Sequence, residues 1–488
     1  MTASDDATGR QAASWAPLRW LIVAIGAAKL LVLACAGPIV QPDTAAYVPF
    51  ADAILDGRAF ARVAWGSEAL PPFVFHMAGY PLFLAAAKLV APGAWAAVSI
   101  VAQDALSLCA MALMFRVGER ILGGAGPAAA ATLLYAGLAS LLWDNSLLSD
   151  SLYAALFDIV MFALLGAALG CWRLSPMRVA GLAFLWGYSL WTRDSGLAFT
   201  LLPLAVLIAI GSRRAGPAWR RFGAAFGFVL GVALMVEAYR LFNLYRTGEA
   251  FLGITATANV LRPLFDMAAL GYADPFAGAD PLSRAVRATM HARDFPAQWD
   301  FLTGPLFNLC RCTPLQLQSL VLAAYRHAVI HFPIAYSREV LHNFAYFSLA
   351  SDVADPVGAI NQFVEQGMPS ATPRIPGLSL QHLAALAEDF SAGRLVLMLV
   401  AGFCNVMAAL LFTLFLFGVP WIWLRERPRR AAVDALAFLW LVFVGVVLGF
   451  SLLHREARHS LPVLPAAEIG IVYTVSRLAA LRRQGRAG

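Results

Sequence analysis

Long apolar runs constrain this chain more than any other feature. The first of them, WLIVAIGAAKLLVLACAGPIV, ends at residue 40, and several more follow it. Such runs approach or exceed the roughly 20 residues that a helix needs to cross a bilayer. Only 13% of the residues are charged and the mean hydropathy is +0.70. Lipid leaves helices or a closed barrel as the spanning structures, and the runs lack the alternation of a barrel. The sequence therefore predicts an all-α polytopic membrane protein.

The apolar runs predict about 10 transmembrane helices, within a range of 10–12. The expected spans are 18–37, 95–117, 127–143, 151–171, 179–191, 195–211, 222–243, 396–424, 433–453 and 461–477. An even number of spans returns the C-terminus to the side of the membrane on which the N-terminus lies. The connections between the spans decide which side this is.

Arginine is concentrated in alternate connections. The arginines are Arg116 and Arg120; Arg173 and Arg178; Arg213, Arg214, Arg220 and Arg221; Arg425, Arg427, Arg429 and Arg430; and Arg477, Arg482, Arg483 and Arg486. The positive-inside rule places these connections and both termini in the cytoplasm. This distribution accounts for the net charge of +7 without a nucleic-acid partner. We expect a multi-pass protein of a bacterial inner membrane, surrounded by membrane lipids.

The runs divide the chain into three parts. Residues 1–243 form an N-terminal membrane core with a first outer loop at 38–94, and residues 396–488 hold the last helices and a cytoplasmic tail. The intervening 244–395 is too long for an ordinary connection, so we expect a mostly helical periplasmic domain. Within it, 317–350 mixes apolar residues with Arg and His at helical spacing. This is typical of helices at a membrane interface, although a hidden pair of crossing helices is an alternative.

The common metal- and nucleotide-binding motifs are missing from the sequence. The sequence has no CxxC pair, no HExxH, no Walker loop and no GxGxxG at a strand–helix junction. We therefore expect neither a zinc site nor the use of ATP or a dinucleotide, and no cofactor is firmly predicted, with a divalent metal left open. Cys310 and Cys312 are one residue apart, where a disulfide would be strained, so a free pair and longer-range pairing both stay open.

Ionisable residues within the apolar runs are costly unless they are paired. Glu237 and Arg240 are three residues apart on one helix face and are expected to pair. Lys29 is expected to pair with Asp104 or Asp158, and a proton or ion pathway is the functional alternative.

Asp43 follows the first apolar run, in QPDTAAYVPFADAILDG at residues 41–57. A carboxylate at the membrane surface can stay ionised and act as a general base toward a lipid-borne substrate. The alternative is structural, because Asp is a favoured N-cap and a helical pattern follows it.

Five segments resemble, in order, motifs of the GT-C superfamily of membrane glycosyltransferases. They are similar to its bacterial branch of lipid A aminoarabinose and protein mannosyl transferases. The segments are PDTAAYVPFADAILDG, FHMAGYPLFLAAAKLV, SLLSDSLYAALF, WTRDSGLAFTLLPL and HREARHSLPVLPAAEIG. All five fall on the predicted outer face. The resemblance implies a sugar donor carried on polyprenyl phosphate, a lipid, glycan or protein hydroxyl as acceptor, and inversion of the anomeric carbon.

The resemblance also implies roles for single residues. Asp43 would be the catalytic base, and Asp150 would orient the acceptor or stabilise charge on the sugar. The alternative for Asp150 is an N-cap of helix 151–171.

Arginine and histidine would bind the donor phosphate. The residues assigned to it are Arg193, Arg455, Arg458 and His76, and the substrate pocket would include Tyr47, Tyr80 and His459. The alternatives are a pair between Arg193 and Asp194, a pair between Glu456 and a neighbouring arginine, a surface histidine at His76 and an interfacial tyrosine belt.

Two other classes of function stay open. An O-antigen ligase or polymerase would use a polyprenyl-diphosphate glycan and rely on outer-domain residues such as Arg326, Arg338 and His342. A non-enzymatic lipid or glycan transporter would show inverted repeats, and the sequence shows none.

Overall fold

The protein is described here from a computed structural model. The structure describes residues 5–40, 43–62, 76–213, 216–269, 271–290, 309–349, 412–425, 431–453 and 457–487. These residues are helical or in short connections, apart from one isolated bridge between Ile39 and Ser146. The α-helices are α1 Asp5–Ala36, α2 Thr44–Leu55, α3 Gly79–Val90, α4 Trp95–Leu122, α5 Ala125–Tyr135, α6 Leu141–Trp143, α7 Ser149–Ala168, α8 Pro176–Thr192, α9 Leu201–Ser212, α10 Ala218–Thr247, α11 Thr255–Ala269, α12 Pro281–Met290, α15 Pro314–His331, α16 Pro333–Leu349, α20 Ala431–Leu452 and α21 Leu464–Ala487.

Seven helical segments in this part of the chain are long and apolar enough to cross a membrane. They are Ala16–Cys35, Trp95–Leu122, Ser149–Ala168, Asp194–Ser212, Arg221–Thr247, Ala431–Leu452 and His459–Arg483. The other three predicted spans also coincide with helix: 127–143 with α5 to α6, 179–191 with α8, and 396–424 with a helix at Phe412–Arg425, while 396–411 lies outside the described residues. The predicted all-α polytopic membrane fold is confirmed.

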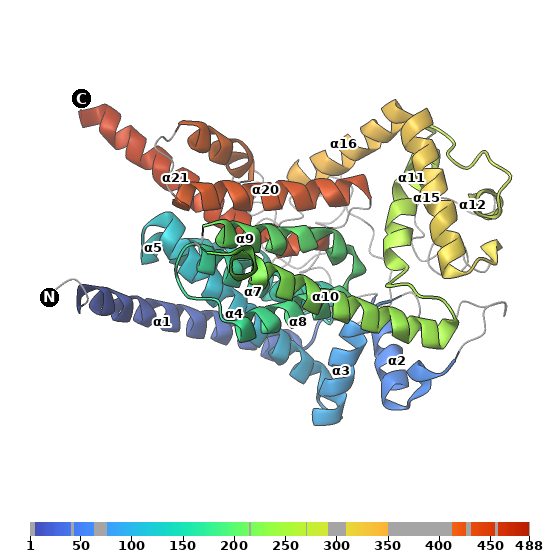
Figure 1. Ribbon diagram of the computed structural model, residues 1–488, viewed down its shortest axis with the longest axis horizontal. Coiled ribbons are helices and arrows are strands. Elements are labelled where there is room, and N and C mark those ends of the chain that lie inside the picture. Colours follow the sequence, from blue (N-terminus) through green and yellow to red (C-terminus); the bar gives the residue numbers. More distant parts are fainter. Residues whose placement is uncertain are drawn as a thin grey trace, which may run out of the picture.

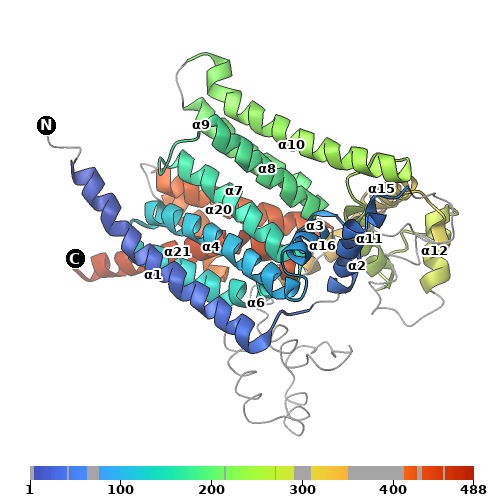
Figure 2. The same cartoon turned by 90° about the horizontal axis from the view of Figure 1, so that it is seen from below.

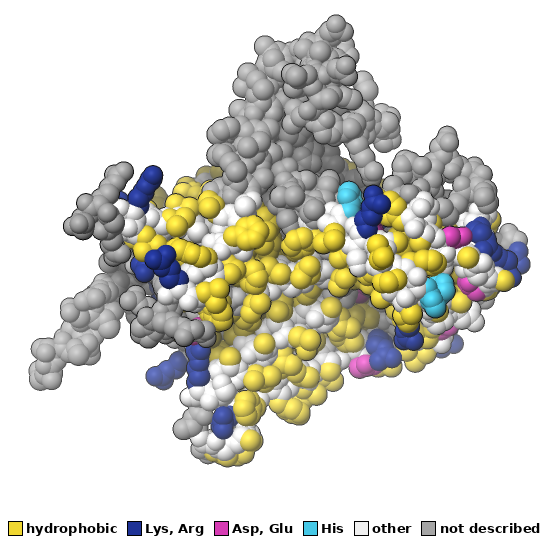
Figure 3. All heavy atoms as spheres, turned by 90° about the horizontal axis from the view of Figure 1, so that it is seen from above, with side chains coloured by type: hydrophobic (Ala, Val, Ile, Leu, Met, Phe, Trp, Pro, Cys, Tyr) yellow, Lys and Arg dark blue, Asp and Glu magenta, His cyan; other side chains and the backbone are white. Residues whose placement is uncertain are grey.

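The long helices lie side by side in one bundle, and both ends of the chain emerge at the same end of it (Figures 1 and 2). Helices α2, α3, α11, α12 and α15 gather at the opposite end, which we call the outer end. Apolar side chains cover the middle of the face in Figure 3, and Lys and Arg side chains lie toward both of its ends. This pattern fits an apolar band that faces lipid between two polar ends.

Helix α7 is the centre of the bundle. Most of its residues are buried, and it packs against α4, α8, α9 and the 3-10 helix η5, Ala457–Val463. It is apolar on almost every face, as expected of a helix surrounded by protein. Neighbouring helices have conventional start signals: in α8, Ser175 accepts a hydrogen bond from the Arg178 N–H and Pro176 opens the first turn. Helix α7 has no such cap, because Leu148 stands at its N-cap position and makes no side-chain hydrogen bond. Its start is therefore fixed by the surrounding helices.

The charges within the bundle are paired only partly as predicted. Lys29 is fully buried and donates to Asp104 at 2.8 Å, as expected, but its second partner is Asp144 at 2.5 Å. Of the two predicted alternatives Asp104 is the partner and Asp158 is not; Asp158 lies on α7, and its Oδ2 has no hydrogen-bond partner among the described residues. Glu237 and Arg240 do pair, at 2.7 Å.

The outer region from residue 251 to 336 has a hydrophobic core of its own. Phe265, Phe276, Val286 and Val321 are buried in it, on or beside helices α11, α12 and α15. Cys310, also in this core, is joined to Cys312 in a disulfide across Arg311, whose positive φ of 53° turns the chain sharply enough for the two to meet. This outcome answers the open question about the two cysteines, and the limits 244–395 of the domain stay a prediction.

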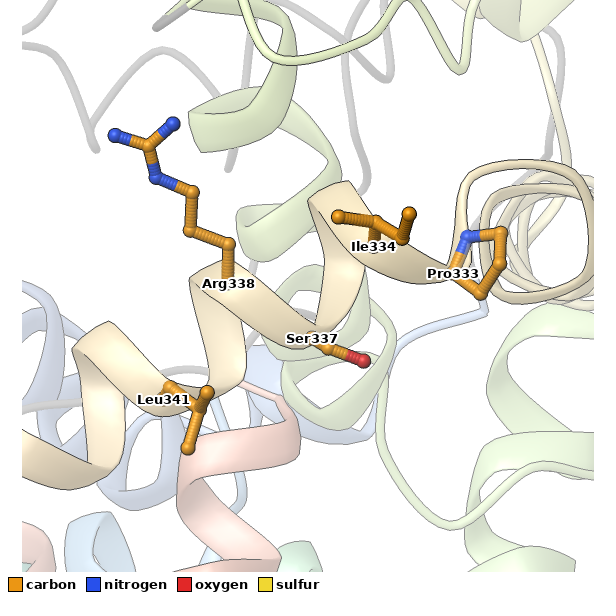
Figure 4. Close-up of a pocket in the computed structure, with 5 residues that line it drawn as sticks. All are labelled: Pro333, Ile334, Ser337, Arg338 and Leu341. Atoms are coloured by element: carbon orange, nitrogen blue, oxygen red, sulfur yellow. The ribbon is translucent and has the colours of Figure 1, made fainter.

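Helix α16 connects the outer region to the bundle. The Tyr336 hydroxyl donates to the Leu452 carbonyl at 2.9 Å, and Asn343 lies 3.4 Å from the Ser451 carbonyl. Its other face carries a shallow groove lined by Pro333, Ile334, Ser337, Arg338 and Leu341 (Figure 4). Ile334 is 85% exposed, and Arg338 lies over the Tyr272 ring at 4.2 Å. Such a mixed face suits the predicted location at a membrane interface, which stays a prediction.

Candidate functional site

Arg193 is the centre of a charged cluster at the outer end. It follows α8 directly and leads into the 3-10 helix Asp194–Thr200. Its guanidinium forms an ion pair with Asp150, and another of its nitrogens lies 2.8 Å from His459 Nε2. The three residues come from separate segments of the chain, and the Asp150 side chain is only 2% exposed. We call Arg193, Asp150 and His459 the Arg193 cluster.

The Arg193 cluster decides two of the alternatives. Helix α7 begins at Ser149 with Leu148 at the N-cap position, so the proposal that Asp150 caps this helix is wrong. Asp150 lies in the first turn and faces a cation. Arg193 pairs with Asp150 from another helix, so its contacts reach beyond its sequence neighbour Asp194. A guanidinium can still offer further N–H groups to a phosphate, because it carries five.

His459 is held on two sides. Its ring stacks on Phe450 of α20, with centroids 4.4 Å apart and an interplanar angle of 25°. Its Nε2 faces Arg193. Because the cationic Arg193 donates the hydrogen bond, Nε2 is the acceptor and the proton of neutral His459 is on Nδ1. His459 therefore orients Arg193, in addition to any contact with substrate.

The first outer loop lies against the start of α7. The backbones of Ile39 and Asn145 bond at 2.9 Å, Thr44 donates to the Leu147 carbonyl at 2.8 Å, and the Tyr47 hydroxyl is 2.9 Å from Ser149 Oγ. Ser149 directly precedes Asp150. The loop that carries Asp43 and the helix that carries Asp150 are thus brought together. That the two carboxylates share one site stays a prediction.

Asp43 occupies the N-cap position of α2, but its side chain makes no capping hydrogen bond. Its carboxylate is half-buried, in contrast to the buried Asp150. The position fits the structural alternative, while the missing cap bond removes the physical reason for it. A role in chemistry stays a prediction for Asp43.

The aromatic residues assigned to the substrate pocket form a group beside Asp43. Tyr47 packs edge-on against both His76 and Tyr80, with centroids 5.0 Å apart in each case. Tyr80 is fully buried and its hydroxyl donates to Gln103 at 2.7 Å. This bond places Tyr80 in the protein interior and gives it a structural function; the interfacial-belt alternative does not describe it. Arg455 lies outside the described residues, and for Arg458 only the backbone, in η5, is described.

Two glycines let neighbouring backbones close around the site. A Cβ on Gly79 would lie 2.5 Å from the carbonyl carbon of Trp191, two residues before Arg193. A Cβ on Gly253 would overlap the Asp194 carboxylate and the Met77 sulfur. The connection from α10 to the outer region is therefore pressed against the turn that carries Arg193. Close approach of this kind requires glycine.

Arg246 is a buried cation that the sequence analysis missed. It is near the outer end of α10, is 2% exposed and lies over the Phe242 ring at 5.1 Å. The sequence carries a signal for it, because an arginine at the predicted outer end of a span departs from the positive-inside pattern. Among the described residues no cluster of three or more His, Cys, Asp or Glu could hold a metal ion.

The structure defines the class as a polytopic helical membrane protein with a charged cluster at its outer end. No protein-family model matches the chain, and no curated protein sequence matches it. Among solved structures, the chain is similar to ArnT from Cupriavidus metallidurans, in a crystal structure bound to undecaprenyl phosphate. The match covers 94% of this chain and 78% of that chain, at 15% identity and a TM-score of 0.37. At this score the superposition carries no argument about the site, which stands on its own residues.

Proposed function

We propose that this protein is a glycosyltransferase that moves a sugar from a polyprenyl-phosphate donor to an acceptor hydroxyl at the outer membrane face. The observation that carries the proposal is the Arg193 cluster beside the Asp43 loop, at the end of the bundle opposite the termini. A polyprenyl phosphate holds its charge at the interface while its tail stays in lipid. A site for it needs a cation at that depth, and Arg193 is one.

Asp43 is proposed as the base because the two carboxylates differ in their surroundings. Asp150 is buried, and its carboxylate is already paired with the cationic Arg193. Asp43 is half-buried at the start of α2, on the loop that bonds to the start of α7. It takes the proton of the acceptor hydroxyl as the acceptor oxygen bonds to the anomeric carbon. The bond from that carbon to the phosphate oxygen breaks, and polyprenyl phosphate leaves with the electron pair, with inversion at the carbon.

Arg193 stabilises the charge that develops on the leaving phosphate. Asp150 holds the guanidinium from one side and His459 from another, so the cation is oriented before the donor arrives. Preorganised charge of this kind avoids rearrangement during the reaction, which makes it worth more than a mobile surface arginine. The outer face of a bacterial inner membrane is the proposed location, and a lipid, glycan or protein supplies the hydroxyl.

Reconstitution with two donors tests the proposal. Protein in nanodiscs is given either a polyprenyl-phosphate sugar or a polyprenyl-diphosphate glycan, with lipid, glycan and peptide acceptors in parallel. We expect transfer from the monophosphate alone, with release of polyprenyl phosphate. Transfer from the diphosphate alone would favour the ligase or polymerase, and no transfer from either would favour the transporter.

A further inference from the structure

A second buried charged group lies beneath the candidate site, and the proposed reaction does not use it. Lys29 of α1 is fully buried and lies between Asp104 of α4, at 2.8 Å, and Asp144, which follows α6, at 2.5 Å. Ser140 completes the group: its hydroxyl donates to Asp144 at 2.5 Å and its carbonyl lies 3.5 Å from the ammonium. We call Lys29, Asp104, Asp144 and Ser140 the Lys29 anchor.

The cost of burying the Lys29 anchor requires an explanation. Removing each ion from water costs several kcal/mol, and apolar residues of similar volume often replace a buried pair without loss of stability. Here one ammonium serves two carboxylates, and Asp104 Oδ2 has no hydrogen-bond partner among the described residues. Stability alone is therefore a weak reason for the group. Ionisable residues within a membrane usually serve function or the placement of functional groups.

The Lys29 anchor fixes the segment that leads to Asp150. Asp144 begins the connection from α6 to α7, and Asp150 is six residues further on. Ser140 ends a π-helical turn, Ala136–Ser140. Its carbonyl accepts from the Asp144 N–H at 3.0 Å and also lies 3.5 Å from the ammonium. The connection is thus held at its first residue by the Lys29 and Ser140 side chains.

The same turn of α4 also contacts the aromatic residues beside Asp43. Gln103, next to Asp104, bonds the carbonyls of Asp144 and Ser146 at 3.2 and 3.0 Å and accepts from Tyr80 at 2.7 Å. Tyr80 packs against Tyr47, whose loop carries Asp43. Contacts from α4 therefore reach both the Asp43 loop and the Asp150 helix.

We infer that the Lys29 anchor is a positioning device that sets Asp150, and through it Arg193, relative to Asp43. This inference rests on the proposed function for its kinetic readout. Loss of the ammonium leaves two buried carboxylates that repel each other, and Asp144 moves away from Asp104. The 144–148 connection then shifts, and the Arg193 cluster loses its alignment with the base.

A double-mutant cycle tests the inference. Lys29→Met, Asp150→Asn and the double variant are compared for turnover and for donor affinity in nanodiscs. We expect Lys29→Met to lower turnover by about 10- to 100-fold, in the range that misplacement costs, with little change in donor affinity. In the double variant it should add almost nothing to the effect of Asp150→Asn. Additive effects would overturn the inference, because they would mean that Lys29 does not act through Asp150.

The chain offers a matched control. Lys88, its only other lysine, pairs with Asp52 at 2.5 Å between α3 and α2, outside the bundle. Lys88→Met should leave turnover unchanged and show no coupling to Asp150→Asn. Equal effects of Lys29→Met and Lys88→Met would overturn the inference.

A readout without turnover separates this inference from the proposed function. Hydrogen exchange should rise at 39–44 and 143–150 in Lys29→Met, where the Ile39, Asn145 and Leu147 backbone bonds lie, and stay unchanged there in Lys88→Met. Lys29→Met/Asp104→Asn/Asp144→Asn serves as a second variant if the single one misfolds. Wild-type protection at both segments in a folded variant would overturn the inference, even if transfer were never detected. Local loss of protection in a protein that transfers no sugar would count against the proposed function and not against the anchor.

Discussion

The outer end of the bundle and the outer helices α11, α12, α15 and α16 hold their charged side chains in different ways. At the bundle end, charged side chains are buried and bonded from several directions, as Arg193 is by Asp150 and His459. On α16, Arg338 lies on an exposed groove and is held by a single aromatic ring. Burying a charge costs free energy and requires contacts in fixed directions, whereas an exposed charge costs little and its contacts can rearrange. The proposed chemistry needs a cation held in a fixed direction, and of these two arginines only Arg193 at the bundle end is held in that way.

Replacing Asp43 should have the largest effect. Asp43→Asn should keep donor binding but lower turnover by about 10²- to 10⁴-fold, because an amide cannot take up the acceptor proton. Single-turnover transfer in nanodiscs measures this. Asp56→Asn is the control, since Asp56 ends the same helix and forms an exposed pair with Arg58. Near-normal turnover in Asp43→Asn would leave Asp43 as a residue at a helix start.

Replacing Arg193 should have the second-largest effect on transfer. Arg193→Ala should weaken donor binding and slow transfer by about 10²- to 10³-fold, the range for loss of one preorganised charge donor. Arg193→Lys should recover only part of this, because lysine lacks the planar fork. Donor titration and turnover are the measurements, with Arg240→Ala as the control from an exposed pair. Wild-type values for both Arg193 variants would rule out the phosphate role.

Replacing Gly253 tests whether the connection after α10 must pack closely against the turn that carries Arg193. Gly253→Ala should destabilise the protein by about 1–3 kcal/mol, as overpacking does, because its Cβ would displace Asp194 or Met77. Thermal unfolding in detergent measures the loss. Gly227→Ala on α10 is the control, because its Cβ meets nothing within 4 Å. If the two variants unfolded at the same temperature, the contact between the connection and the Arg193 turn would be loose.

Arg338 should give the smallest effect. Arg338→Ala removes a cation–π contact of about 0.5–1 kcal/mol and should leave turnover unchanged. Tyr272→Leu is the matched variant on the other side of the contact, and the thermal shifts of the two should agree. A large loss of transfer in Arg338→Ala would move the chemistry to the outer helices and favour the ligase alternative.

Seven of the ten predicted spans coincide with helices long and apolar enough to cross a membrane, because hydrophobic length is a local property that lipid enforces. The sequence also placed Asp150 and Arg193 at the same end, since the alternation of arginine-rich connections orders the helix ends. The partners were harder to predict. Of the two partners proposed for Lys29, Asp104 is confirmed and Asp158 is not, and the sequence does not point to Asp144, because Asp144 lies in the short connection 144–148, outside the predicted spans. The pairing of Arg193 with His459 spans 266 residues, and no periodic pattern reports a contact at that separation.

The two partners of Lys29 have a consequence for how the chain enters the membrane. The lysine lies in the first helix, while Asp104 and Asp144 follow it by 75 and 115 residues. During synthesis the first helix therefore emerges with an unpaired ammonium, whose long side chain can reach toward the headgroups. We expect α1 to sit shallowly until α4 and α6 have been made, and only then to settle into its final depth. The order of translation thus delays the locking of the first helix until the chain has been made as far as residue 144.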